Sequence, residues 1–144
     1  MATLYGVNYT KYNTGPTSAN IVARGVNGGT VKCLLDTYEA AGTTAGDVVY
    51  VGKPLKAGDI VLYWKVAFDD LGTGVTLDLG DTNNDNLYAD GIDVATAAGN
   101  SDTILVDGMN YVIGTNTDDN ILTATLQDAA ATGTLKVCIF YVES

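Results

Sequence analysis

The chain has 144 residues, a mass of 15.0 kDa and a formal net charge of −10. Its seven basic residues are scattered along the sequence, so we expect neither direct nucleic-acid binding nor attachment to an anionic membrane surface. Histidine is absent, which excludes Ser-His-Asp and Cys-His catalysis together with the commonest zinc ligand.

The composition favours strands and turns over helices. Apolar residues make up 47% of the chain, glycines number 17, and glutamate occurs only at Glu39 and Glu143. No run reaches the roughly 18–20 apolar residues of a membrane helix, and no signal peptide is expected from the opening MATLYGVNYTK. We therefore expect residues 1–144 to form one domain with no membrane span.

Residues 1–30 are rich in Asn, Thr, Gly and Tyr, and they form either a first strand or an extended N-terminal arm. Tyr5, Tyr9 and Tyr12 then line an edge of the domain or contact a neighbouring subunit. Tyrosine suits a contact because it combines a large apolar area with a polar tip. We take these three tyrosines as candidate interface residues.

Further strands are predicted along the chain. Residues 31–38 and 47–51 are predicted strands, separated by a small-residue turn at 39–46 with one helical turn at most. Residues 60–68 alternate with a period of two, which places Ile60, Leu62, Trp64, Val66 and Phe68 on the core face. Trp64 could also serve as a sugar-stacking platform, but its inward position favours core packing.

After a turn at residues 71–74, a short strand follows with Val75, Leu77 and Leu79 inward, and then an Asp/Asn loop. Residues 92–98 are mixed and hold at most a short helical turn, and residues 99–101 read as loop. Strands are predicted at 103–106, 109–113, 121–126 and 134–142. The last of these is apolar on both faces, so we expect it to be central or beneath a subunit interface. Eight to ten short strands indicate an all-β sandwich or barrel.

The segment LGTGVTLDLGDTNNDNLYADGIDVATAAG, residues 71–99, resembles a segment of small phage virion proteins. The shared pattern is a Leu-Gly-Thr turn, the run Val-Thr-Leu-Asp-Leu-Gly-Asp, an Asp/Asn loop, and then a Tyr and a further Asp. Some such proteins resemble capsid decoration, or cement, proteins, which sit as trimers on icosahedral heads. The resemblance implies a single-domain antiparallel β-sandwich of jelly-roll type. It contains no catalytic signature, and it implies no site residue.

Two groups of residues could carry a chemical function. Asp81, Asn83 and Asp85 have the i, i+2, i+4 spacing of calcium loops, but Asn86 and Ile92 stand where an EF-hand has its Gly and its bidentate Glu. A turn in which Asp and Asn cap their own backbone amides is preferred, and no metal is expected. The aspartates of residues 69–93 could also pair as in a glycosidase, yet an acidic surface loop supplies such pairs without function. No catalytic residue is assigned.

Cys33 and Cys138 lie far apart in strand-like runs. We interpret them as two buried, reduced thiols that pack as small apolar groups. A disulfide requires their Cα atoms to lie within roughly 7 Å, which the sequence does not show.

The resemblance implies a non-enzymatic phage structural protein without a cofactor. It would decorate and stabilise the capsid as a homotrimer, with the major capsid protein as its partner. Its location would be the capsid surface of the virion, after assembly in the host cytoplasm. The alternative is a head- or tail-fibre-type binding module for host-surface glycan, calcium-dependent or not, that uses the Asp/Asn loop and exposed tyrosines. Metal dependence or glycan binding by the isolated chain separates the two hypotheses.

Overall fold

The computed structural model describes residues 29–115 and 121–144. Within these ranges the chain forms nine strands and no helix, and so no helix that could cross a membrane. The strands are β1 (Val31–Thr43), β2 (Asp47–Tyr50), β3 (Ile60–Phe68), β4 (Thr76–Asp81), β5 (Ala89–Asp93), β6 (Gly99–Ser101), β7 (Tyr111–Val112), β8 (Leu122–Gln127) and β9 (Ala131–Val142).

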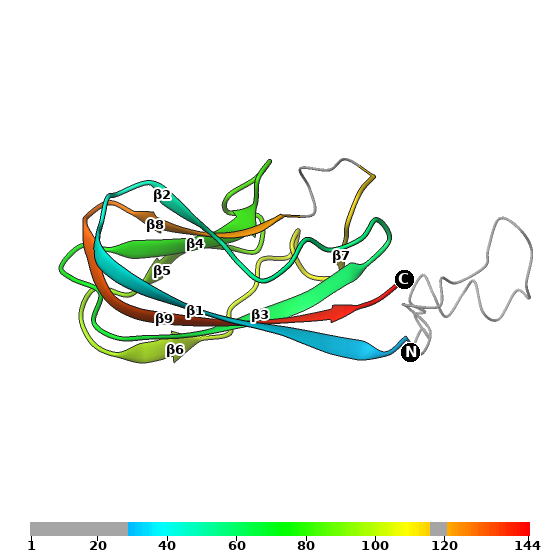
Figure 1. Ribbon diagram of the computed structural model, residues 1–144, viewed down its shortest axis with the longest axis horizontal. Helices are drawn as coiled ribbons and strands as arrows, with labels where there is room; N and C mark the ends of the chain where they lie inside the picture. The colour runs from blue at the N-terminus through cyan, green and yellow to red at the C-terminus, as the bar shows by residue number, and fades with distance from the viewer. Residues whose placement is uncertain (1–28, 116–120) are drawn as a thin grey trace, which may run out of the picture.

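The strands form two antiparallel sheets that pack face to face (Figure 1). One sheet has the order β1-β9-β3-β6, with β7 also paired to β3, and the other has the order β2-β8-β4-β5. The chain can be followed as one long antiparallel ribbon whose turn lies between β4 and β5. The successive strand pairs of this ribbon are β1·β9, β2·β8, β3·β6 and β4·β5. Successive pairs fall in opposite sheets, so the ribbon is rolled. This is the eight-stranded jelly roll, and it confirms the predicted fold class.

The two ends of the sandwich differ. At one end the start of β1 lies beside the C-terminus, because Val31 pairs with Val142 (Figure 1). At the other end the chain passes between the sheets, from β1 into β2 and from β8 into β9 (Figure 1). The fold therefore closes through pairing between residues more than 100 positions apart, which is typical of β-sandwiches.

The core lies between the sheets, and the predicted alternation of β3 and β4 supplies much of it. Trp64 is 1% exposed and packs against Tyr88, with ring centroids 5.4 Å apart, so its predicted core role is confirmed. The three residues Val75, Leu77 and Leu79 are also buried, as the alternation predicted. Since β9 lies between β1 and β3, its predicted central position is confirmed as well.

One part of the predicted alternation is wrong. Val61 was expected to face outward, but it is completely buried, whereas Leu62 is only half-buried. The register of β3 against β9 shifts between Val61 and Tyr63. A β-bulge inserts one residue that has no partner on β9. The alternation of inward and outward side chains is therefore offset by one residue across the bulge.

Four predicted elements also differ from the structure. Residues 39–43, expected in a turn, continue β1, because they pair with residues 131–134 of β9. Residues 99–101, expected in a loop, form β6 at the edge of β3. Residues 103–106 form no strand, and residues 92–98 form no helical turn. In the first two cases, tertiary pairing overrides the weak local preference.

Asp59 fastens the C-terminal end of the chain. Its carboxylate is 2% exposed, accepts a hydrogen bond from the Lys56 amide at 2.9 Å, and accepts another from the Ser144 amide at 2.9 Å. Lys32 of β1 forms an ion pair with Glu143, the residue that follows β9. These bonds hold β9 and the start of β1 against the β2–β3 connection.

Candidate functional site

The outward surface of β1, β9 and β3 is a candidate interface within the described residues. Strand register arranges its side chains in rows across the sheet: Cys33 is opposite Phe140, which is opposite Tyr63. The next rows are Leu35–Cys138–Lys65 and Thr37–Lys136–Ala67. We call this surface the β1–β9–β3 face and define it by Val31, Cys33, Leu35, Thr37, Tyr63, Lys65, Ala67, Lys136, Cys138 and Phe140.

Half of the face is apolar. Leu35 is 76% exposed and Val31 54% exposed, and Tyr63 stacks on Phe140 with ring centroids 4.4 Å apart. Isolated apolar residues on a surface need no explanation, but a contiguous group on one sheet face is typical of a contact site. Aromatic rings are also enriched in protein interfaces. This half of the face therefore has the composition of a protein contact.

The part of the face around Lys65 and Lys136 is hollowed and carries positive charge. Two shallow hollows, of about 350 and 360 Å³, share Ala67 and Lys136 in their walls. The second hollow is also lined by Leu35, Lys65 and Cys138. Two lysines therefore lie side by side on the outer face of a chain whose net charge is −10.

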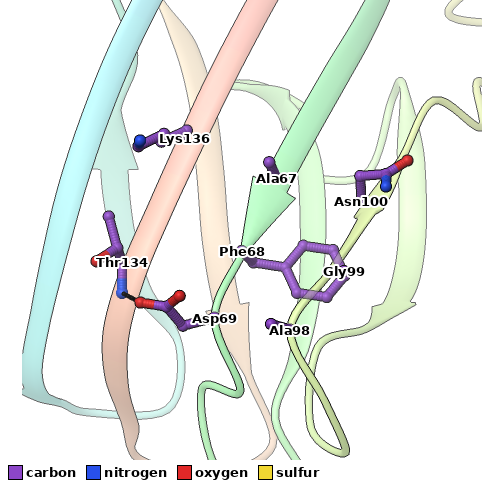
Figure 2. A pocket seen from close by; sticks show the side chains of 8 residues that line it. All are labelled: Ala67, Phe68, Asp69, Ala98, Gly99, Asn100, Thr134 and Lys136. Atoms are coloured by element: carbon purple, nitrogen blue, oxygen red, sulfur yellow. Dashed lines mark hydrogen bonds between the residues drawn. The ribbon is translucent and has the colours of Figure 1, made fainter.

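Figure 2 shows the first hollow, at the end of β3. The Phe68 ring lies against Gly99, where a Cβ atom would come within 3.2 Å of the ring (Figure 2). The Asp69 carboxylate accepts a hydrogen bond from the Thr134 amide at 3.0 Å, which lowers the pKa of Asp69 (Figure 2). Asp69 is therefore an ionised acceptor that fixes the loop to β9, not a proton donor at neutral pH.

A third hollow lies on the opposite sheet, and the candidate calcium residues line it. Asp81, Asn83 and Asp85 line a space of about 320 Å³, together with Val48, Tyr50, Thr82 and Thr123. Asp81 is 2% exposed, and its Oδ1 accepts hydrogen bonds from the amides of Asn83 at 2.8 Å and Asn84 at 2.9 Å. That geometry is the capping turn that we expected in preference to a metal loop.

The other acidic residues that the structure describes are not gathered into a group of metal ligands. Within residues 29–115 and 121–144, no group of three or more His, Cys, Asp or Glu side chains is arranged to hold a metal ion. Asp78 accepts a hydrogen bond from the Gly91 amide at 2.7 Å, and burial raises its pKa. The candidate interface residues Tyr5, Tyr9 and Tyr12 lie outside the described residues.

The prediction for the two cysteines is wrong in one respect. Neither thiol is buried: Cys33 is exposed and Cys138 is half-buried, on the outward side of adjacent strands. Their Sγ atoms lie 2.7 Å apart. Sequence periodicity did not reveal this contact, because it depends on the pairing of the first and last described strands.

A second exposed apolar group lies in the segment that leads into β7. Val106 is 91% exposed, and Met109 and Val112 are each more than half exposed. The segment is anchored to the core by the hydrogen bond from the Leu105 amide to the Tyr88 carbonyl at 2.7 Å. It lies at the same end of the sandwich as the C-terminus (Figure 1).

No family model and no curated protein matches this chain. Among solved structures, it is similar to a chain of the cyanophage Pam1 capsid asymmetric unit, with 23% identity and a TM-score of 0.65. That alignment covers 90% of this chain and 98% of the other. A structure of infectious bursal disease virus, Gt strain, aligns with 12% identity and a TM-score of 0.34, covering 81% of this chain and 38% of the other. The likeness to the cyanophage chain establishes a shared fold.

Proposed function

We propose that this chain is a phage structural protein that decorates the assembled capsid as a homotrimer. The observation that supports this most is the near-complete alignment with a chain of the cyanophage capsid asymmetric unit. Because each chain covers almost all of the other, that capsid chain is a protein of similar length. The residue pattern of the segment 71–99 points to the same class of protein independently.

The trimer contact that we propose places the β1–β9–β3 face of one copy on the acidic surface of the next. Lys65 and Lys136 give the face two positive charges, whereas Asp85, Asp90 and Asp93 are exposed on the loops and strand beyond β4. A contact between two different surfaces is heterologous, and such contacts close into rings when the rotation permits. Complementary charge sets the orientation of the copies, and the apolar half of the face supplies buried area.

The proposed role is mechanical. A trimer that binds only the assembled shell stabilises that shell by mass action, in the same way that a ligand stabilises the state that it binds. The major capsid protein would be the partner, and the capsid surface would be the location. The net charge of −10 would keep decorated particles from associating with one another.

The test uses purified particles that contain this chain. We expect mild urea to release it while the shell stays closed, and the released chain to have the mass of a trimer by light scattering, with or without EDTA. Stripped heads should open at a lower temperature than native heads, and re-addition of the chain should restore the difference. A shell that falls apart when the chain is released would contradict decoration and indicate a shell-forming subunit.

Charge reversal tests the proposed face within the same experiment. Juxtaposed like charges cost several kcal/mol at an interface, so Lys65→Glu/Lys136→Glu is expected to run as a monomer. Lys53→Glu is the matched control, because Lys53 is an exposed lysine on the β2–β3 connection. A double variant that remains trimeric would exclude this face, and a monomeric native chain would exclude a trimer in solution.

A second candidate function is glycan binding at the hollow beside β2. Tyr50 is 65% exposed there, close to the polar side chains of Asp81, Asn83 and Asp85. The buried Thr123 hydroxyl also faces this region without a hydrogen-bond partner among the described residues. An exposed ring beside several oxygen acceptors and amides suits a sugar, which offers an apolar face and a rim of hydroxyls.

Binding of the isolated chain to a panel of bacterial surface polysaccharides tests this candidate. Tyr50→Ala is expected to weaken binding by up to about tenfold, since stacking on an aromatic ring supplies about 0.5–1.5 kcal/mol. Tyr63→Ala, on the opposite sheet, is the control and should bind normally. Loss of binding in EDTA would indicate that the site requires calcium. Absence of binding to every polysaccharide would leave decoration as the single proposal.

A further inference from the structure

Cys33 and Cys138 are neighbours across the outermost strand pair of the β1–β9–β3 face. Cys33 is opposite Phe140 and Cys138 is opposite Leu35, so the two cysteines occupy adjacent rows and point to the same side of the sheet. Their Sγ atoms are 2.7 Å apart and both are free thiols. They are the only cysteines in the chain.

The separation is close to bonding distance. A disulfide has an S–S length of about 2.05 Å, so the two sulfur atoms need to approach by well under 1 Å. The two residues are diagonal neighbours, which lie farther apart on a sheet face than directly opposite residues, so bond formation requires side-chain rotation and a small shift of β1 against β9. No rearrangement of the fold is required.

We propose that these cysteines are an oxidation site at which a disulfide between β1 and β9 forms when the chain meets an oxidising disulfide such as oxidised glutathione. The inference concerns the free chain and does not depend on the proposed function. The disulfide would be a covalent modification that joins the first described strand, β1, to the last, β9.

The reaction balances as two thiol–disulfide exchanges. The Cys33 thiolate, after losing its proton to solvent, attacks one sulfur of oxidised glutathione and releases the other half as a thiolate. The Cys138 sulfur then loses its proton, attacks the Cys33 sulfur of the mixed disulfide, and releases the second glutathione. Two protein thiols are oxidised and one glutathione disulfide is reduced to two thiols.

The order of attack follows from exposure. Cys33 is exposed, so it is the thiol that a soluble disulfide reaches first. Burial and the hydrogen bond with Cys33 raise the pKa of Cys138 to about 11, so Cys138 is almost wholly protonated at neutral pH. Proximity compensates for this in the second step, because its partner sulfur is already in contact.

The disulfide would fasten an edge strand to its neighbour. Among the described residues β1 is an edge strand, paired with β9 alone. A bond between residues 105 positions apart closes a long loop and restricts the unfolded chain. We therefore expect oxidation to raise the melting temperature by about 10 °C.

The experiment compares the full chain in dithiothreitol with the chain equilibrated in oxidised glutathione. We expect the oxidised chain to lose two hydrogen atoms by intact mass, to lose both titratable thiols, and to melt about 10 °C higher. Cys33→Ser/Cys138→Ser is the control and should melt at one temperature in both buffers. Cys138→Ser should trap a glutathione adduct on Cys33, whereas Cys33→Ser should react much more slowly.

The same measurements are made in the Lys65→Glu/Lys136→Glu background, in which the face is uncovered if it forms a trimer contact. If the Lys65→Glu/Lys136→Glu chain is oxidised and the native chain is not, the inference holds for the free chain, and assembly protects the thiols. Two titratable thiols after oxidation in both backgrounds, or a disulfide between two chains, would overturn the inference.

Discussion

Gly80→Ala is expected to destabilise the fold by about 3 kcal/mol or more and to lower the melting temperature by roughly 10 °C. A Cβ atom at this position in β4 would come within 2.0 Å of the Asn84 carbonyl oxygen and 2.4 Å of the Asp85 carbonyl carbon. Both are backbone atoms, so no side-chain rotation relieves the contact. The loop that folds back over β4 would have to move, which breaks the hydrogen bond from the Asp81 amide to the Asn84 carbonyl.

Gly46→Ala is the matched control for this prediction. Gly46 has a φ of +87°, and nothing lies within 4 Å of a Cβ atom added to it. Its substitution therefore costs only the left-handed backbone conformation, about 1–2 kcal/mol. Thermal unfolding of the two variants separates steric from torsional cost, and an equal or smaller loss in Gly80→Ala would contradict the close approach of the loop.

Trp64→Ala is expected to destabilise the protein by about 3–5 kcal/mol, the cost of removing a large buried aromatic side chain and leaving a cavity. Trp64 is 1% exposed at the centre of β3 and contacts Tyr88, which itself packs edge-on against Tyr111. The cavity would therefore loosen the attachment of β7 as well as the contact between the two sheets. Urea denaturation measures the loss.

Two further substitutions sharpen this prediction. Trp64→Phe should cost clearly less, because the Trp64 Nε1–H has no acceptor among the described residues, so the change breaks no hydrogen bond there. Tyr63→Ala, one position earlier on the outward side, should cost about 1 kcal/mol through its lost stacking on Phe140. A loss in Trp64→Ala no greater than that in Tyr63→Ala would contradict the position of Trp64 in the core.

The two hypotheses for this chain share the Asp/Asn loop. The proposed trimer contact uses the β1–β9–β3 face of one copy and the acidic residues Asp85, Asp90 and Asp93 of the next, whereas glycan binding uses Tyr50 and the hollow that Asp85 also lines. A trimer contact at Asp85 would therefore lie beside the sugar site. Lys65 belongs to the decoration hypothesis alone and Tyr50 to the glycan hypothesis alone, so variants of these two residues distinguish the two functions.

Sequence reasoning located the core of β3 and β4 but not the limits of several strands. Alternation is a local signal, and it identified Trp64, Leu77 and Leu79 as buried because burial on one sheet face requires a period of two. It failed at Val61, where a bulge in the pairing with β9 reverses the side-chain direction. It also missed β6, a three-residue strand that exists only because β3 offers it a paired edge.

The sequence by itself determined the all-β class, the single sandwich and the inward side of the central strands, since composition and periodicity act over a few neighbouring residues. Tertiary structure alone decided which surface carries the lysines, where the Asp/Asn loop lies, and that the two cysteines are in contact. Each of these depends on pairing between distant strands, as with Cys33 and Cys138, which lie 105 positions apart. Such pairing is selected by the packing of the whole core, so no local pattern encodes it.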